Sequence, residues 1–321
     1  MNSINNFHLI DFKYLFFDIF YKNNQIHLIL PTYDHTPFDS NDIILKVDDR
    51  RLNVSTEHIQ RDFYGPGCIY IYDFVSKNKS INVKVEYQGK PNLYTLTHIK
   101  TSTTPTLTLT TLCKDDYRLF APFYKYYKEQ GVSHFYIYYN NQLTQEVKDV
   151  FDKEDVTLLE WNHLWMLNSN THHAQTGQLS HSLFKYGKDA CEHMIFCDLD
   201  EYLRVPKLTL KELVTINKDH INIFGFRNMW SRTVDGKVSD EFPTTFYISE
   251  DLHQYPTRAK NIYNVETVTS IFVHYPFGDH DPSKTMHGDT MRIYHFYNWS
   301  QPNRINEHIN GLLTLSEYEA V

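Results

Sequence analysis

Short apolar runs separated by polar turn residues fill the first hundred positions. Six of these runs have the length and the aromatic or β-branched content of strands: residues 14–20, 25–30, 42–47, 68–74, 81–87 and 92–99. Lys22-Asn23-Asn24 and Gln88-Gly89-Lys90-Pro91 stand between consecutive runs and predict two hairpins. Since no amphipathic helix pattern interrupts the runs, we expect residues 1–102 to form a small all-β, sandwich-like domain.

The pattern changes after the polar segment 100–105, which ends in proline and marks a domain boundary. Strand-like runs then alternate with stretches of helical spacing. The expected strands are 106–112, 134–139, 156–161 and 194–198, and the expected helices are 117–130, 143–151 and 174–193. This alternation is typical of α/β domains, so we expect residues 103–321 to hold a Rossmann-like mixed, mostly parallel sheet with flanking helices. Ligands of such sheets bind outside the carboxyl ends of the strands.

Three carboxylates directly follow the last of these strands. In an extended segment Asp198 and Asp200 point to the same side, where their charges repel unless a cation lies between them. A hard divalent ion prefers oxygen ligands and can bridge to a diphosphate. We expect Glu201 to orient the loop or a sugar, or to form a surface salt bridge. The alternative is that the acidic residues cap a helix after the strand.

Composition restricts the classes of ligand that the protein can bind and indicates its cellular compartment. The formal net charge is -8 and Lys and Arg are not clustered, which excludes a general affinity for nucleic-acid backbones. The 4 cysteines lack metal-ligand or redox spacing, as expected of thiols in a reducing compartment. Residues 1–6 show no signal-peptide pattern, and no run reaches the ~18–20 apolar residues of a membrane span. We therefore expect a cytoplasmic protein without a transmembrane segment.

Several segments of the second region occur in the order of a known family. They are residues 112–119 (LCKDDYRL), 131–140 (GVSHFYIYYN), 197–203 (CDLDEYL), 258–262 (RAKNI), 272–274 (FVH) and 294–297 (YHFY). The second and third are similar to the patterns G-V-x-H-F-x-I-Y-D-N and D-x-D-E-F-[IL]. Over residues 106–300 the sequence resembles glycosyltransferases with the GT-A fold, and within them glycosyltransferase family 92. Two positions depart from the family pattern: Tyr139 replaces an aspartate, and Ala121-Pro122 replaces Glu-Trp.

The resemblance implies an enzyme that transfers a hexose from a nucleotide-sugar donor. The implied donor is a UDP-sugar such as UDP-galactose, and the implied cofactor is Mn²⁺ or Mg²⁺. Transfer to a hydroxyl of a glycan acceptor would invert the anomeric carbon. A β-rich N-terminal module also fits the family, and it would position the acceptor, bind carbohydrate or mediate a homodimer.

The expected metal ligands are Asp198 and Asp200, and Asp198 is also expected at the donor diphosphate. In GT-A enzymes a third ligand often comes from a late histidine. His274 is preferred over His295, because it ends the apolar run 268–273, which would aim it at the same edge of the sheet. A histidine on an apolar segment is, however, more often a satisfied core residue.

Five further residues are candidates for donor binding. Lys114 and Asn140 lie at the ends of two predicted strands, where we expect the uridine or the ribose. Arg258 and Lys260 are expected to neutralise the diphosphate, with a solvated basic strand edge as the alternative. Gln178 lies in the predicted helix before the acidic cluster and is expected to face the donor or the solvent.

An inverting transfer needs a general base that deprotonates the acceptor hydroxyl. The candidates are carboxylates that follow the strand-like run 226–230, with Glu241 or Asp240 preferred and Asp235 next. Trp230 could stack on an acceptor sugar, although a buried tryptophan is the commoner state.

Other function classes are open at this point. A retaining glycosyltransferase or a nucleotidyltransferase could use a similar sheet, and product stereochemistry or release of pyrophosphate would separate them. A carbohydrate-binding protein with a degenerate transferase domain is favoured by Tyr139 and opposed by the intact Asp198 and Asp200. A metal-binding structural module would not need the late histidine segments.

Overall fold

The computed structural model describes residues 16–30, 40–59, 68–100, 104–166, 172–250, 258–277, 280–300 and 314–317. The chain is a mixed α/β protein that forms two compact units. The first unit joins residues 1–102 with 163–186 and 269–271, and the second comprises 103–162, 187–268 and 272–321. The first unit therefore takes in later stretches of the chain as well as the N-terminal strands.

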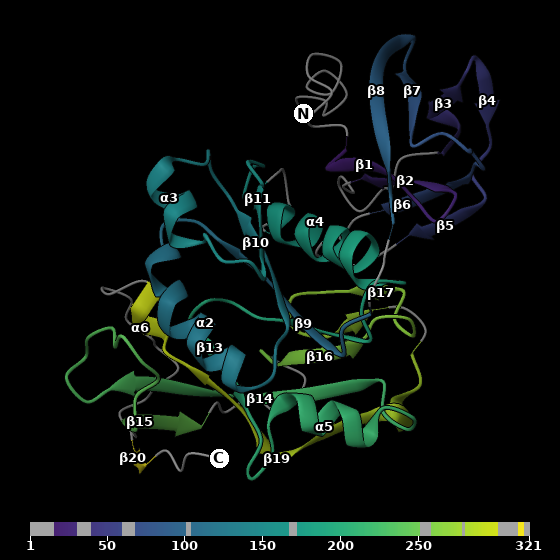
Figure 1. The fold of residues 1–321 in the computed structure, drawn as a ribbon. Coiled ribbons are helices and arrows are strands. Elements are labelled where there is room, and N and C mark those ends of the chain that lie inside the picture. Colours follow the sequence, from purple (N-terminus) through teal and green to yellow (C-terminus); the bar gives the residue numbers. More distant parts are fainter. Residues whose placement is uncertain are drawn as a thin grey trace, which may run out of the picture. The chain divides into compact units, whose positions relative to one another are not determined.

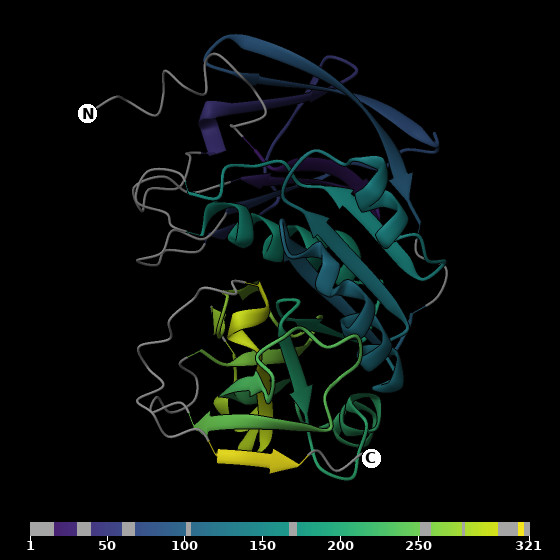
Figure 2. The same cartoon turned by 90° about the vertical axis from the view of Figure 1, so that its left-hand side faces the viewer.

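The first unit is built around an eight-stranded sheet (Figure 1 and Figure 2). Its strands are β1 (Asp18–Lys22), β2 (Gln25–Leu30), β3 (Ile43–Val47), β4 (Arg50–Leu52), β5 (Thr56–Ile59), β6 (Cys68–Asp73), β7 (Ser80–Tyr87) and β8 (Lys90–Ile99). They follow the order β4-β3-β7-β8-β1-β2-β6-β5, and every neighbouring pair is antiparallel except β1 with β8. Strand β17 (Ser270–Ile271) also belongs to this unit.

Both predicted hairpins are present. Asn23 and Asn24 join β1 to β2 with φ of 51° and 61°, and Gln88 and Gly89 join β7 to β8 with φ of 48° and 75°. Two consecutive residues of positive φ are the signature of a type I′ turn, whose twist matches that of the paired strands. Asparagine and glycine tolerate this conformation best, so the turn residues explain the pairing.

Alternate side chains from both halves of the sheet form one hydrophobic cluster. Tyr21, Leu28 and Tyr70 contribute from β1, β2 and β6, and Leu45 and Val83 contribute from β3 and β7. All five are fully buried. Because neighbouring residues of a strand point to opposite faces, β1 and β2 have a second apolar face that also needs a cover.

Helix α4 covers this second face. It runs over His173–His181, all of whose residues are buried, and continues as a π-helix over Ser182–Gly187. The ring of Phe184 lies 6.3 Å from that of His27 on β2. The observed α-helix is therefore shorter than the predicted helix 174–193, because it changes to a π-helix at Ser182.

Two charged residues of β1 hold the end of α4. Asp18 Oδ2 accepts hydrogen bonds from His181 Nε2 and Lys185 Nζ, both at 2.7 Å. Lys22 Nζ donates to the carbonyl oxygens of Phe184 and Lys185, at 3.1 Å each. Carbonyl groups at the end of a helix lack partners within the helix, which explains the buried lysine. Burial acts to raise the pKa of Asp18, but the contacts with His181 and Lys185 lower it well below its usual range.

The second unit contains a mixed sheet. The strands of this sheet are β9 (Leu107–Cys113), β10 (His134–Tyr139), β11 (Val156–Glu160), β12 (His193–Phe196), β13 (Glu201–Arg204), β14 (Ile223–Thr233), β15 (Thr245–Glu250), β16 (Lys260–Asn264), β19 (Thr285–His295) and β20 (Thr314–Glu317). Strand β18 (Pro276–Phe277) belongs to the same unit but lies outside this sheet. The order is β11-β10-β9-β12-β16-β14-β15-β20, and β19 pairs with both β13 and β14. The first four strands are mutually parallel, whereas β16, β14, β15 and β20 pair antiparallel, so the parallel part is smaller than expected.

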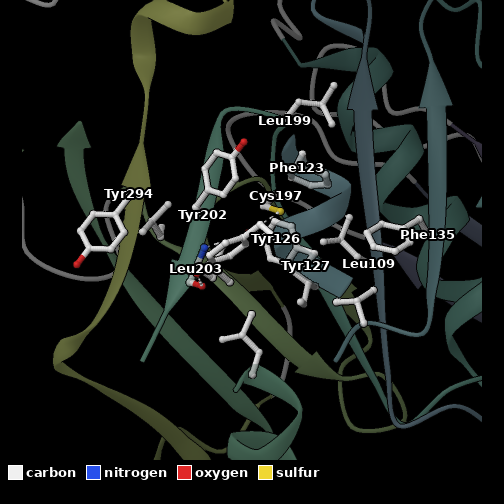
Figure 3. Close-up of a cluster of buried hydrophobic side chains, with 14 of the residues drawn as sticks. Leu109, Phe123, Tyr126, Tyr127, Phe135, Cys197, Leu199, Tyr202, Leu203 and Tyr294 are labelled. Carbon is white, nitrogen blue, oxygen red and sulfur yellow. Dashed lines mark hydrogen bonds between the residues drawn. The ribbon is translucent and has the colours of Figure 1, made fainter. Parts of the chain in front are cut away.

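The second unit also contains α-helices. They are α2 (Phe120–Glu129), α3 (Gln145–Val150), α5 (Leu210–Asn217) and the short α6 (Tyr297–Ser300). Phe123, Tyr126 and Tyr127 of α2 share one hydrophobic cluster with Leu109 and Phe135 of the sheet (Figure 3). Among the helices that the structure describes, none has the length and apolar character needed to cross a membrane.

Candidate functional site

The acidic segment is a tight turn between β12 and β13. Strand β12 is buried between β9 and β16 and ends at Phe196. Cys197, Leu199 and Tyr202 belong to the hydrophobic cluster of this unit (Figure 3). Asp198 lies between them in sequence, yet 36% of its side chain is exposed. Alternate apolar residues thus anchor the turn while the first aspartate reaches the surface.

Tyrosines of α2 fix the strand that follows the turn. The hydroxyl of Tyr127 donates to the carbonyl oxygen of Glu201 at 2.8 Å and accepts from the amide of Leu203 at 3.0 Å. The neighbouring Tyr126 donates to the carbonyl oxygen of Leu203 at 2.7 Å. Buried polar groups whose partners are all in place make a structure rigid. The position of the acidic turn is therefore set by α2 as well as by β12.

Glu201 closes the turn on itself. Its amide donates to the carbonyl oxygen of Asp198 at 3.1 Å, and its Oε2 accepts from the amide of Asp198 at 2.8 Å. The side chain of Glu201 is 3% exposed. Of the roles expected for Glu201, the structure shows orientation of the loop, and the burial of its carboxylate excludes a surface salt bridge.

Lys260 brings a positive charge into the turn. Phe196 pairs with Asn261, so Lys260 lies one residue beyond the end of β12. Its Nζ is 2.8 Å from Asp198 Oδ2 and 3.1 Å from Glu201 Oε2, and its side chain is 2% exposed. Burial acts to lower the pKa of Lys260, but the two carboxylates raise it far above its usual value. The lysine is therefore a permanent cation.

Asp200 has partners of its own. Its Oδ2 accepts a hydrogen bond from the Ser300 hydroxyl at 2.6 Å and lies 3.6 Å from His295 Nε2. Its carbonyl oxygen accepts from the amide of Phe296 at 2.8 Å. Burial acts to raise the pKa of Asp200, but His295, Ser300 and Lys260 lower it below the usual value. In return Asp200 raises the pKa of His295, against the opposing effect of burial.

Strand register places His295 in the middle of a row across three strands. His295 pairs with Glu201 of β13 on one side and with Trp230 of β14 on the other. The indole of Trp230 lies on the imidazole, with ring centroids 4.7 Å apart. The guanidinium carbon of Arg258 lies 5.3 Å from the centre of the Trp230 ring. Trp230 is 3% exposed, so it is in the buried state rather than an open platform for a sugar.

The residues expected at the nucleotide lie at the ends of β9 and β10. Lys114 is exposed, and its amide donates to Asp116 Oδ1 at 3.0 Å. Asn140 is buried; its amide donates to the carbonyl oxygen of Cys113 and its side-chain Nδ2 to that of Trp161, both at 2.8 Å. Asn140 thus ties the two strand ends together, and Lys114 lies where a ligand can reach it.

The sequence reasoning missed Asp116. This carboxylate follows β9, and its pKa is raised to about 6 by burial and by the negative charges of Asp200 and Asp198. The carboxylates of the acidic turn therefore interact electrostatically with Asp116 in the loop after β9. Its signal in the sequence is the pair Asp115-Asp116 directly after the first strand of the α/β pattern. Ser300 was also missed, since a serine one hundred residues from the motif carries no local signal.

The remaining candidates occupy separate positions. His274 Nδ1 is 3.3 Å from the carbonyl oxygen of Ala259, next to Lys260. The carboxylate of Glu241 pairs with Lys125 of α2 at 2.5 Å, on the surface, and Asp240 beside it is exposed. Their expected roles, like that of His274 at the metal, stay predictions. Gln178 is buried within α4 of the first unit, and its place at the donor also stays a prediction.

The sequence profile of glycosyltransferase family 92 matches residues 111–317, which is more than half of the chain. The protein belongs to glycosyltransferase family 92. No curated protein matches its sequence. Among solved structures, amylomaltase from Corynebacterium glutamicum is similar at 10% identity and a TM-score of 0.19, over 43% of this chain. The matched part is 23% of that structure.

The matched region is a glycosyltransferase family 92 domain, and the name of the family denotes enzymes that transfer a sugar from a donor to an acceptor. The matched region begins within β9 and ends at the last residue of β20. It therefore contains the acidic turn together with Lys260, His295 and Ser300. The strands of the first unit that precede residue 100 lie outside it.

A divalent ion fits this family 92 site under one condition. Within the described ranges, no group of three or more His, Cys, Asp or Glu side chains could hold a metal by itself. Mg²⁺, however, is usually bound by one or two carboxylates together with substrate phosphates, and not by an all-protein cage. Asp198 and Asp200 supply oxygen donors of that kind. The residues present therefore fit an ion whose remaining ligands come from a diphosphate.

Proposed function

We propose that this family 92 glycosyltransferase moves a hexose, with galactose favoured, from a UDP-sugar to a glycan hydroxyl with inversion. The observation that carries the proposal is the acidic turn after β12. Its first aspartate is partly exposed, while the rest of the turn is anchored by Glu201, Lys260 and Ser300. A rigid, acidic turn at the carboxyl end of a parallel strand suits a ligand that brings a cation and a diphosphate.

Asp198 and Asp200 would hold the ion, which is Mn²⁺ or Mg²⁺ in this proposal. When bound, the ion would offset the negative charge that develops on the departing nucleoside diphosphate. His295 and Ser300 hold the pKa of Asp200 below its usual value, and its side chain is only 6% exposed, so it would meet the ion from the buried side of the turn. His295 and His274 remain alternatives for a third protein ligand, and the contact with Asp200 favours His295.

The remaining donor contacts are proposed from position and charge. Arg258 lies over Trp230 and would pair with the diphosphate through its N–H groups, because a stacked guanidinium is pre-organised for two-point contacts with phosphate. Lys114 would contact the nucleoside at the ends of β9 and β10. The four parallel strands β11, β10, β9 and β12 support a GT-A-like domain, and the N-terminal strands support a β-rich unit that also takes in α4.

Glu241 and Asp240 are proposed as the general base. Glu241→Gln and Asp240→Asn separate the two, since each removes one carboxylate at nearly constant volume. Loss of a positioned base typically lowers the rate by about a hundredfold or more. If neither variant lowers kcat to that extent, the base is another group.

Calorimetric titration of UDP with and without Mn²⁺ tests the donor site. We expect binding that needs Mn²⁺ and that is lost in Asp200→Ala. Asp73→Ala is the control, because Asp73 is an exposed aspartate at the end of β6, outside the acidic turn. Binding that survives in Asp200→Ala would reject the assignment of the acidic turn. Absence of UDP binding in the wild type would reject a uridine donor, and GDP would be titrated next.

A further inference from the structure

We propose that Lys260 is a built-in cation that restricts the acidic turn to a single divalent ion and keeps Glu201 out of the metal's coordination sphere. The inference rests on the proposed metal-assisted function and assigns Lys260 a role different from contact with the diphosphate. It concerns the charge and the ligand set of the turn, which the donor proposal leaves open.

The geometry shows how Lys260 occupies the turn. Its Nζ lies between one oxygen of Asp198, at 2.8 Å, and one oxygen of Glu201, at 3.1 Å. The side chain is almost completely buried, so the ammonium is shielded from solvent and held in one place. A buried ammonium needs paired anionic partners, since its desolvation is otherwise too unfavourable. If Lys260 swung out to a ligand, the buried carboxylate of Glu201 and the partly exposed one of Asp198 would both lose their cationic partner.

Glu201 has no oxygen directed to the surface of the turn. Its Oε2 accepts both from Lys260 and from the amide of Asp198, and its Oε1 lies 3.8 Å from His295 Nδ1. Because Lys260, the amide of Asp198 and His295 lie against its two oxygens, Glu201 acts from beneath the turn as a positioning residue. Asp198, which shares the same lysine, remains 36% exposed.

The charge balance follows from these contacts. Asp198, Asp200 and Glu201 bring three negative charges, and Lys260 offsets one of them. One divalent ion then balances the two negative charges that remain within the turn. A second ion would meet net repulsion in a site of low dielectric, where interactions between charges are strong. Without Lys260, the oxygens of Asp198 and Glu201 would both face the space left by the ammonium.

Mn²⁺ binding with inorganic pyrophosphate, which supplies phosphate ligands without a nucleoside, tests the proposal, by calorimetry or by electron paramagnetic resonance. Lys260→Met is expected to bind Mn²⁺ about tenfold more tightly than the wild type or to take up a second ion. The double variant Lys260→Met with Glu201→Gln removes both charges and is expected to stay within about threefold of the wild type. It also replaces a buried ion pair by neutral groups, which proteins tolerate better than a lone buried charge.

Each outcome decides between the roles. The proposal would be overturned if Lys260→Met bound Mn²⁺ no more tightly than the wild type does. It would also be overturned if neither the wild type nor any variant bound Mn²⁺. If Lys260→Met does not fold, the double variant decides: affinity about tenfold below the wild type would make Glu201 a metal ligand and overturn the proposal. Failure of UDP to bind wild type with Mn²⁺ would reject the donor proposal alone, because these comparisons use Mn²⁺ without nucleotide.

Discussion

The indole of Trp230 packs on the imidazole of His295, with the two ring centroids 4.7 Å apart and an interplanar angle of 34°. The guanidinium of Arg258 lies over the same indole. A single buried aromatic side chain thus supports two residues of the proposed donor site, one of which, His295, lies next to Asp200.

The first prediction concerns this support. Trp230→Leu removes the aromatic face and is expected to weaken UDP binding by about tenfold, because Arg258 and His295 lose a contact of roughly 1–2 kcal/mol. Trp230→Phe keeps a ring at the same place and is expected to retain most of the affinity. The measurement is calorimetric titration of UDP with Mn²⁺, on variants shown to be folded by circular dichroism. Equal affinities for Leu and Phe would mean that Trp230 serves only the core.

The second prediction is a pH dependence of stability at His295. Its pKa is raised above the unfolded value of about 6.5, because Asp200 outweighs the effect of burial. The stabilisation is therefore fully present below that value and is lost as the pH rises through the folded pKa. Urea unfolding of the wild type and of His295→Gln should show a larger difference at pH 6 than at pH 9.

His27 provides a control of opposite sign. Burial, together with the charges of Lys22 and His58, lowers its pKa to about 3. The folded state therefore favours neutral His27, and the unfolded chain gains a proton as the pH falls below about 6.5. The stability difference between wild type and His27→Gln should shrink on acidification. A common trend for both histidines would contradict the assigned charge states.

The third prediction concerns Gly131 at the end of α2. Its φ is 87°, and a Cβ added there would lie 2.6 Å from Lys211 Cβ of α5. Gly131→Ala should lower the free energy of unfolding by about 2–4 kcal/mol, since it adds a steric clash to backbone strain. Gly89→Ala is the matched control: its φ is 75° with nothing within 4 Å, so only about 1–2 kcal/mol is expected. Equal losses would mean that α5 shifts to make room.

The fourth prediction concerns the hydrogen bonds that Asp18 of β1 accepts from His181 of α4 and from Lys185 of the π-helix. Asp18→Asn should lower the free energy of unfolding by about 3–5 kcal/mol, because it leaves His181 and Lys185 without their shared carboxylate. Asp73→Asn, at an exposed position of the same unit, should change it by less than about 0.5 kcal/mol. Urea unfolding measures both. A small effect at Asp18 would show that water replaces the carboxylate.

Local patterns predicted the local structure well. The runs at 25–30 and 134–139 are strands β2 and β10 with the same bounds, and the turn residues Asn23 and Gly89 have the positive φ that their hairpins need. These features depend on neighbours in sequence, where alternation of polar and apolar residues and the conformational preferences of asparagine and glycine act directly. The position of the acidic turn after a buried strand was predictable for the same reason.

The partners of the acidic turn were not predictable, because they depend on pairing between distant strands. His295 reaches Asp200 through the register of β13 with β19, and Lys260 reaches Asp198 through the register of β12 with β16. A shift of one residue would turn either side chain to the opposite face. Nothing in the sequence near Ser300 indicates that it follows His295 into the same site.

For a related reason, the sequence did not indicate which sheet α4 packs on. An entirely buried helix carries no amphipathic signal that would indicate which sheet it covers, and α4 stands in the chain between two strands of the other unit. The charged anchors Asp18 and Lys22 lie in a short strand, where the sequence gives no indication that they reach a helix synthesised much later.

Because α4 covers β1 and β2, these strands are synthesised first but can complete their packing only after α4 has been synthesised. The N-terminal strands leave the ribosome first, but their second apolar face, with Phe20 and His27, stays open until residues 173–187 have emerged. A nascent chain that stops before this point exposes the kind of surface that holding chaperones recognise and that promotes aggregation. The N-terminal strands are therefore not a portable module, and a fragment intended to fold alone would have to carry α4 along with them.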